Sequence, residues 1–246
     1  MVELNIVSKR YWGKRALENI SLRLPRGEIV GLFGENGAGK TTLMKCILGL
    51  LPFEGTVTLD GEPVTRKNIA SFSFATSEHS FFPNLTAQAH RDFYAAHFPR
   101  FSDQRFHSLM DFFSLPMHQT LRTFSTGQKN QFEVILALSQ GADYILMDEP
   151  FAGNDLFNRE DFYKVLSGIL EPHETLLLST HLIEEVSGSI GRAVLLRRGT
   201  LAGDLSVDDL EESGTSLVDA IKEAYHYRAD RVSRAIGELS GEEGEK

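Results

Sequence analysis

The sequence predicts an α/β fold, and three observations lead to that class. Short apolar runs with the length and composition of buried strands occur at residues 28–33, 144–147 and 175–179. A glycine-rich loop, residues 34–39, follows the first run and precedes a segment of helical character, residues 40–51. Aromatic residues then recur at helical spacing over residues 85–142, which predicts an inserted α-helical subdomain.

The N-terminal residues are predicted to form an antiparallel β subdomain. Residues 4–24 alternate between apolar and polar side chains on either side of a turn at residues 13–15, which predicts two strands. A further hairpin is expected from the strand at residues 56–59 and the turn at Asp60 and Gly61.

The remaining elements complete a single domain. Helices are expected from Asn130 and over residues 158–170, and a hairpin about Gly199 is expected from residues 193–204. Beyond Ser206 the chain is amphipathic and then acidic, which indicates a docking helix and a frayed end. We predict a core with the β subdomain from residues 1–84 and 143–205, a helical subdomain at 85–142 and a C-terminal extension at 206–246.

The composition and charge of the chain exclude several classes of function. The 246 residues are 41% hydrophobic and 24% charged, as in globular proteins with a substantial core. A net charge of −9 argues against a protein that grips nucleic acid through its phosphates. Cys46 is the single cysteine, which excludes an internal disulfide and suits a reducing compartment. No apolar run reaches the length needed to span a bilayer, so we expect a cytoplasmic chain that meets any membrane through a partner.

The glycine-rich loop fits the pattern G-x-x-x-x-G-K-[ST]. Its glycines allow successive backbone N–H groups to face an anion, and the following helix adds its positive N-terminal dipole. Lys40 supplies a charge for β- and γ-phosphates, and the Thr41 hydroxyl can ligate Mg²⁺. The predicted phosphate-binding residues are Gly34, Asn36, Gly37, Ala38, Gly39, Lys40, Thr41 and Thr42.

Two acids end the strand at residues 144–147. Asp148 is expected to orient Mg²⁺ or its bound water, and Glu149 to act as the base that accepts a proton from an attacking water. An apolar run followed by two acids is by itself a common solvated strand end. Together with the phosphate loop, it predicts a site for hydrolysis of a nucleoside triphosphate.

Two further segments fit the same chemistry. Ser125, Gly127 and Gln128 lie next to the helix expected from Asn130, where a helix N-terminus can bind an anion. Taken alone, they fit an ordinary N-cap equally well. His181 follows the strand at residues 175–179, where its imidazole could reach a γ-phosphate and the attacking water, and we expect it to be catalytic with Glu149 and Lys40.

These four segments, in this order, resemble the nucleotide-binding subunit of ATP-binding cassette (ABC) transporters over about residues 2–205. Residues 34–42 resemble the Walker A loop and 144–149 resemble Walker B with its catalytic glutamate. Residues 124–128, Phe-Ser-Thr-Gly-Gln, resemble the signature that is usually Leu-Ser-Gly-Gly-Gln. Asn154 stands where the D-loop usually has leucine, and His181 matches the switch histidine. The resemblance implies a P-loop NTPase (RecA-like) core, and the helical region and signature are similar to those of exporters from bacteria.

The resemblance also implies the cofactors and a dimer. ATP and Mg²⁺ would bind between two subunits that face head to tail, so that Ser125, Gly127 and Gln128 of one close on the nucleotide of the other. Asp155 would lie at the same interface. An aromatic residue would stack on the adenine; Trp12 is favoured because it precedes Gly13, and Tyr11 stays open.

One position departs from the family. Ser77 stands where a glutamine usually senses Mg²⁺ and relays to the membrane subunit, with Glu78 beside it. Serine is too short to reach the metal in the same way. We therefore expect either substitution by Glu78, an indirect contact, or slow hydrolysis.

The resemblance implies partners as well. These are transmembrane permease subunits and a second ABC subunit, identical or related, at the cytoplasmic face of the membrane, with export favoured and no nucleic acid bound. A soluble ABC ATPase acting on ribosomes or DNA is the alternative, but the chain has one cassette, no heptad arm and a negative charge. A kinase would leave residues 125–128 and His181 without a role.

Overall fold

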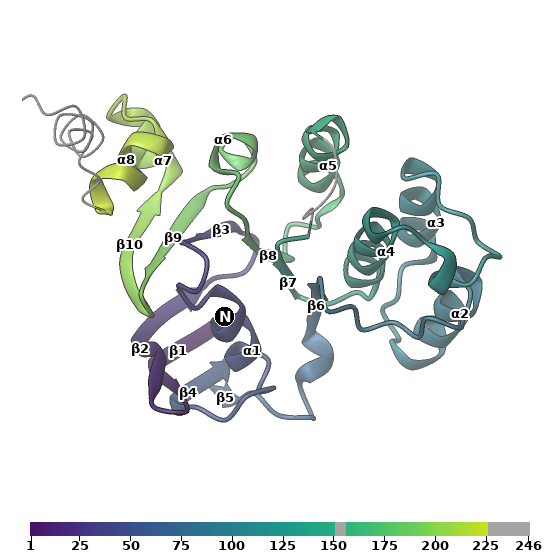
Figure 1. The fold of residues 1–246 in the computed structure, drawn as a ribbon, viewed down its shortest axis with the longest axis horizontal. Coiled ribbons are helices and arrows are strands. Elements are labelled where there is room, and N and C mark those ends of the chain that lie inside the picture. The colour runs from purple at the N-terminus through teal and green to yellow at the C-terminus, as the bar shows by residue number, and fades with distance from the viewer. Residues whose placement is uncertain (151–155, 226–246) are drawn as a thin grey trace, which may run out of the picture.

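The computed structural model describes residues 1–150 and 156–225, and two sheets organise them (Figure 1). The first is antiparallel and four-stranded, in the order β2 (Lys14–Leu24), β1 (Val2–Tyr11), β4 (Glu54–Leu59), β5 (Glu62–Pro63). The second is six-stranded, in the order β10 (Thr200–Ser206), β9 (Arg192–Arg197), β3 (Ile29–Phe33), β8 (Thr175–Ser179), β7 (Tyr144–Asp148), β6 (Phe72–Thr76). Its strands run parallel except β10, which pairs antiparallel with β9. The predicted α/β class and the antiparallel N-terminal sheet are confirmed.

The parallel sheet separates two apolar cores. Side chains of a strand alternate between faces, so Leu146 packs with α1 (Lys40–Ile47) and the antiparallel sheet. Ile145 and Met147 instead pack with the helices on the other face. β7 and β8 are buried along their whole length, as expected for parallel strands that are covered on both sides.

Three helices stand beside β6 as a group (Figure 1). They are α2 (Ala87–His97), α3 (Asp103–Phe112) and α4 (Thr126–Ser139). Short 3₁₀ turns occur at Ile69–Ser71, before β6, and at Leu121–Thr123, before α4. α5 (Leu156–Ile169) and α6 (Ile183–Val186) cover the parallel sheet on the same side as this group. Among the residues that the structure describes, no helix is both long and apolar enough to cross a membrane.

Several predicted boundaries were wrong by a few residues. α4 begins at Thr126 rather than Asn130, because Ser125 and Gln128 form a reciprocal capping box at its start. α1 ends at Ile47 rather than near residue 51, since Gly49 adopts a left-handed φ of 66° that an α-helix cannot continue through. The first hairpin turns at Trp12 and Gly13, both with positive φ, so Lys14 belongs to a strand.

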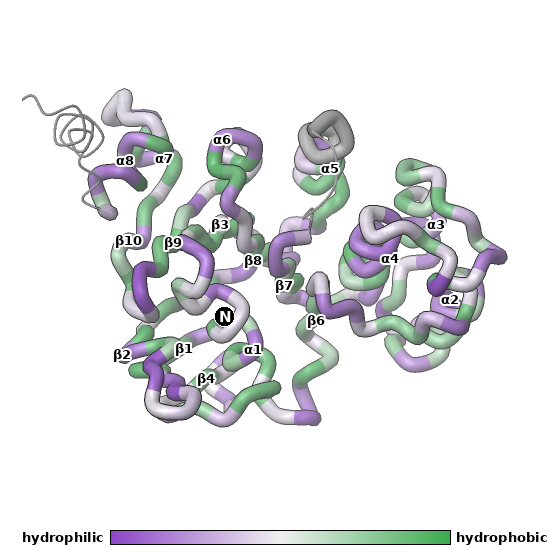
Figure 2. Tube along the Cα trace, viewed as in Figure 1, coloured by the Kyte–Doolittle hydropathy of each residue, from purple (hydrophilic) through white to green (hydrophobic). Residues whose placement is uncertain are grey.

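The chain beyond β10 forms two short helices, α7 (Val207–Glu212) and α8 (Leu217–Ala224). Hydrophilic and hydrophobic residues both occur along α8 (Figure 2). Leu217 and Ile221 bury its apolar face in the core that lies on the α4 side of the parallel sheet. The C-terminal segment up to Tyr225 is therefore packed on the sheet, as an amphipathic pattern predicts.

A buried ion pair ties the helical group to the sheet. The Arg105 guanidinium on α3 lies 2.8 Å from Oε1 of Glu174, and the two side chains are 12% and 4% exposed. Arg105 also donates to the carbonyl oxygens of Leu138 and Ile169. Three partners from different segments thus meet one side chain, so removing it leaves a buried carboxylate without its countercharge.

We expect Arg105→Ala to lower the free energy of unfolding by about 3–5 kcal/mol, the range seen when one partner of a buried ion pair is removed. Arg91→Ala, which removes a partly exposed cation from its pair with the exposed Asp103, is the control and should change stability less. Urea unfolding followed by circular dichroism measures both. Equal effects of the two substitutions would show that burial of the Arg105 pair is not what stabilises this junction.

Candidate nucleotide site

The glycine loop joins β3 to α1 at the carboxyl edge of the parallel sheet. Gly37 and Gly39 have φ values of 81° and 112°, which L side chains rarely adopt. A Cβ on Gly39 would also lie 2.6 Å from the carbonyl oxygen of Ala16, and one on Gly34 would lie 2.5 Å from that of Leu196. The loop therefore keeps its curl, with the N-terminus of α1 behind it, only with glycine at these positions.

A cavity of about 290 Å³ opens over this loop. The residues that line it are Tyr11, Lys14, Arg15, Ala16, Asn36, Gly37, Ala38, Gly39, Lys40, Thr41, Thr42, Asp148 and Glu149. The phosphate-loop residues from Asn36 to Thr42 and the two acids after β7 are thus brought together. Gly34 does not line it, but its carbonyl oxygen accepts a hydrogen bond of 2.7 Å from Nζ of Lys40.

Lys40 is the buried cation of the cavity. Its side chain is 6% exposed, and its Nζ lies 3.7 Å from Oε1 of Glu149. A buried ammonium group needs nearby oxygens, and here it has one carbonyl and one carboxylate. Anionic phosphate oxygens entering the cavity would find this charge already held in place.

A chain of hydrogen bonds crosses the sheet edge beneath the cavity. The Thr41 hydroxyl donates to Oδ2 of Asp148 at 2.5 Å, and the Ser179 hydroxyl donates to Oδ1 at 2.6 Å. Asp148 and Ser179 are direct neighbours in the β7–β8 register, which explains why they meet. The Thr41 hydroxyl thereby connects α1 to the ends of two strands.

Thr41 and Asp148 suit Mg²⁺ in donor type. Both offer oxygen, and Mg²⁺ is usually held by one or two carboxylates together with substrate phosphates and water. In residues 1–150 and 156–225, no group of three or more His, Cys, Asp or Glu side chains could hold a metal by itself. The residues therefore fit a magnesium ion that arrives with a phosphate ligand.

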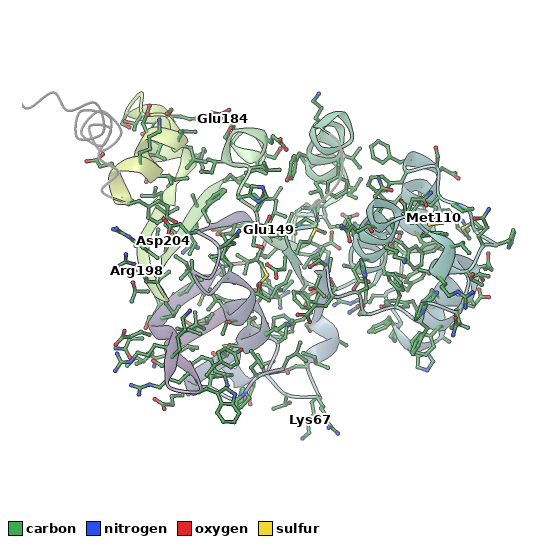
Figure 3. All side chains as sticks on the ribbon, viewed as in Figure 1. Lys67, Met110, Glu149, Glu184, Arg198 and Asp204 are labelled. Carbon is green, nitrogen blue, oxygen red and sulfur yellow. The ribbon has the colours of Figure 1, made fainter. Side chains whose placement is uncertain are left out.

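Glu149 lies near the middle of the molecule, where the sheet edge meets the helices (Figure 3). Its φ of 47° is unusual for a non-glycine residue, and its N–H is held by the carbonyl and the hydroxyl oxygens of Ser179, each at 3.1 Å. Oε2 pairs with Nδ1 of His181 at 2.9 Å, while the buried Oε1 has no hydrogen bond. The strained backbone thus directs an incompletely paired carboxylate towards Lys40 and the cavity.

The predicted signature residues lie elsewhere. The Ser125 hydroxyl accepts from the N–H of Gln128, and Oε1 of Gln128 accepts from the N–H of Ser125, so both side chains cap their own helix. Ser125 is exposed, and neither it nor Gly127 lines the cavity. The structure does not bring these residues to the chain's own phosphate loop.

The aromatic pair at the first hairpin is split. Tyr11 lines the cavity, while Trp12, the residue favoured for adenine stacking, is fully exposed at the hairpin tip and does not line it. The geometry favours Tyr11 for contact with a ligand in this cavity. Asp155 lies outside the described residues.

Glu78, which lies beside Ser77 at the position where the family usually has glutamine, already forms an ion pair. Both of its carboxylate oxygens lie 2.8 Å from Nζ of Lys45 on α1. Ser77 lies next to Glu149 in a small gap between β6 and α4. Neither Ser77 nor Glu78 lines the phosphate cavity, so an indirect contact fits this arrangement better than substitution by Glu78.

Sequence reasoning missed several residues of the site. Lys14 and Arg15 add two cations to the cavity, whereas the sequence places them only in the predicted turn at residues 13–15. Ser179 orients Asp148 and holds the backbone of Glu149, but a serine at a strand end carries no distinctive signal. Glu133, on α4, is 2% exposed and contacts the loop after β6; nothing in its sequence context marks it.

Comparisons with known proteins identify the family. Residues 17–152 match the ABC transporter family. The ABC transporter ATP-binding protein YtrB of Bacillus subtilis is 29% identical over 219 residues, 86% of this chain and 74% of that protein. The SkfA peptide export ATP-binding protein SkfE of the same organism is 31% identical over 86% of this chain and 92% of that protein. The ribose import ATP-binding protein RbsA of Clostridium perfringens is 29% identical over 86% of this chain and 45% of that protein.

A solved structure shows the same fold. The ATP-binding subunit of an ABC transporter superposes with a TM-score of 0.81 at 24% identity, covering 92% of this chain and 99% of the other. The fold, the cavity and the family match agree with one another. The chain belongs to the ABC transporter family, as an ATP-binding subunit with ATPase activity.

Proposed function

We propose that this subunit hydrolyses ATP between two cassettes and drives separate permease subunits at the cytoplasmic face of a membrane, in the direction of export. One observation carries the proposal. Lys40, Thr41, Asp148 and Glu149 gather at one cavity, whereas Ser125 and Gly127 lie outside it. A signature that cannot serve its own phosphate loop is accounted for if it serves the loop of a second subunit.

Each residue of the cavity has a role in this reaction. The loop amides from Asn36 to Thr42 and the Lys40 ammonium group bind the β- and γ-phosphates. Thr41 and Asp148 would hold Mg²⁺, which neutralises phosphate charge when bound. A ring at Tyr11 or Trp12 would stack on the adenine.

Glu149 is placed to accept the proton from the attacking water. Among the described residues, its Oε1 has no hydrogen bond, and its one charged neighbour is the Lys40 ammonium group at 3.7 Å. The second oxygen is held by His181, whose exposed ring would fix the carboxylate and meet the γ-phosphate. Lys40, close to Oε1 without ligand, would exchange that carboxylate for phosphate oxygens when ATP enters.

The dimer would place Ser125, Gly127 and Gln128 of one subunit over the nucleotide of the other. Ser125 is exposed, at the start of a capped helix whose positive N-terminus faces outward. A second ABC subunit, identical or related, would supply the same elements in return. We include Asp155 in this interface on the basis of the resemblance.

The relatives include both directions of transport. SkfE, named for peptide export, and RbsA, named for ribose import, each match 86% of this chain, so the proposal of export is based on the resemblance of the helical region and signature. Polytopic membrane partners would provide the transport path. The cargo would be chosen by those partners.

We expect Lys40→Ala to weaken ATP binding by roughly 10- to 100-fold, because hydrogen bonds to charged groups contribute about 1.5–3 kcal/mol. Titration with a fluorescent ATP analogue measures this. Lys67→Ala is the control, since Lys67 is exposed and lies far from Glu149 (Figure 3). Unchanged affinity in Lys40→Ala would contradict the assignment of the phosphate loop.

We expect Glu149→Gln to keep ATP binding, to lower turnover by about 10²–10⁴-fold, and to trap a closed dimer. The amide keeps the size of the carboxylate but cannot accept the proton. Phosphate release and size-exclusion chromatography with ATP measure the two effects. Hydrolysis at the parental rate would show that Glu149 is not the base.

The membrane partnership is tested by copurification. The tagged chain, recovered from detergent-solubilised membranes with ATP present, should bring a polytopic membrane protein that mass spectrometry identifies. The Lys40→Ala variant should recover less of the closed assembly. Recovery only from the soluble fraction, with ribosomal or DNA-bound proteins, would overturn the transporter assignment and leave the ATP site intact.

A further inference from the structure

A buried carboxylate on α4 holds the loop that follows β6. Oε1 of Glu133 accepts hydrogen bonds from the Ser80 N–H at 2.9 Å and from the Ser80 hydroxyl at 2.5 Å. Oε2 is buried and has no hydrogen-bond partner. The Glu133 side chain is almost wholly inaccessible, so an acid here costs stability that an apolar residue would not.

Two more contacts fix the same loop. Nε2 of His79 pairs with Oδ1 of Asn130, one turn before Glu133 on α4, at 2.8 Å. The N–H of Phe82 donates to Nε2 of His90 on α2 at 2.9 Å. The loop from Ser77 to Phe82 is therefore bound to the helical group rather than free above the sheet.

The contact of Glu133 with Ser80, here called the clamp, lies next to Glu149, the proposed catalytic base. Ser77, Asn130 and Glu133 line one narrow gap together with Glu149. Ser125 is the N-cap of α4, about two turns before Glu133, which lies in the middle of the helix. One rigid helix thus joins the residue that would meet the partner's nucleotide to the loop beside the chain's own Glu149.

We propose that Glu133 is a positioning residue for ATP hydrolysis. It holds the loop from Ser77 to Ser80 against α4. When Ser125 closes on the partner's nucleotide, α4 therefore sets the position of that loop relative to Glu149. This inference rests on the proposed function. It goes beyond it by assigning to a residue outside the phosphate cavity a part in coupling the two sites of the dimer.

The surroundings of Glu133 support a dedicated role. Burial raises its pKa to about 7, while the two hydrogen bonds from Ser80 act in the opposite direction. Tyr94 on α2 is close enough that the charge of Glu133, after burial, contributes to raising the tyrosine pKa to about 12. Burial thus removes the solvation that would favour the charged form of Glu133, and the hydrogen bonds from Ser80 partly replace it.

The test compares Glu133→Ala with Glu133→Gln in the full chain, using steady-state ATP hydrolysis and titration with a fluorescent ATP analogue. The alanine variant should lower kcat by about tenfold, since small misplacements near reacting groups are costly, while its affinity for the analogue stays within about twofold. The glutamine variant keeps an oxygen for Ser80 and should restore most of kcat. A purely structural role would move affinity and kcat together.

Ser80→Ala provides the second arm. It should lower kcat in the same direction, and the double variant Glu133→Ala with Ser80→Ala should be no slower than Glu133→Ala alone, because both remove one clamp. Ser139→Ala is the matched control: its hydroxyl is also buried on α4 and has no hydrogen-bond partner. It should leave kcat unchanged.

Parental kcat in Glu133→Ala, or equal losses of kcat and affinity, would overturn the inference. Multiplication of the two effects in the double variant would overturn it as well. If the parent chain neither binds nor hydrolyses ATP, the proposed function fails. If the parent chain hydrolyses ATP and the substitutions of Glu133 leave kcat unchanged, only the proposed role of Glu133 is overturned.

Discussion

The hydrogen bond between Thr41 and Asp148 is the contact on which the site depends. It joins the first turn of α1 to the end of β7, and Ser179 extends it to β8. Since Ser179 also holds the backbone N–H of Glu149, the same few atoms position the proposed metal ligands and the proposed base. This arrangement is possible because parallel strands end at one edge, where side chains in register become neighbours.

Charge is distributed unevenly around that edge. Lys40 is buried beside Glu149, and Lys14 and Arg15 line the same cavity. The chain as a whole is acidic, with a net charge of −9, whereas this cavity gathers three cations. Such a distribution suits an anionic ligand such as the phosphates of ATP, in agreement with the family.

Local patterns predicted much of the chemistry. The loop before Lys40 and the acids at Asp148 and Glu149 could be found because their spacing is fixed by neighbouring residues in the chain. Adenine stacking was predicted at Trp12, with Tyr11 left open, and Tyr11 is the one of the two that lines the cavity. The hairpin turns at Trp12 and Gly13, one residue earlier than predicted, so Trp12 lies in the turn and Tyr11 ends the strand before it. Roles that depend on distant partners, such as those of Ser179 and Glu133, had no local signature to reveal them.

By itself the sequence determined the strand, glycine loop and helix that bind phosphate, the buried strands of the core, and the acids at their ends. These follow from residue size, backbone freedom and apolar periodicity, which act over a few neighbours. Only the tertiary structure decided the strand order β3, β8, β7, which places Ser179, at the end of β8, beside Asp148 at the end of β7. It also separated Ser125 from that loop, because long-range strand pairing and packing, not local spacing, fix where α4 lies.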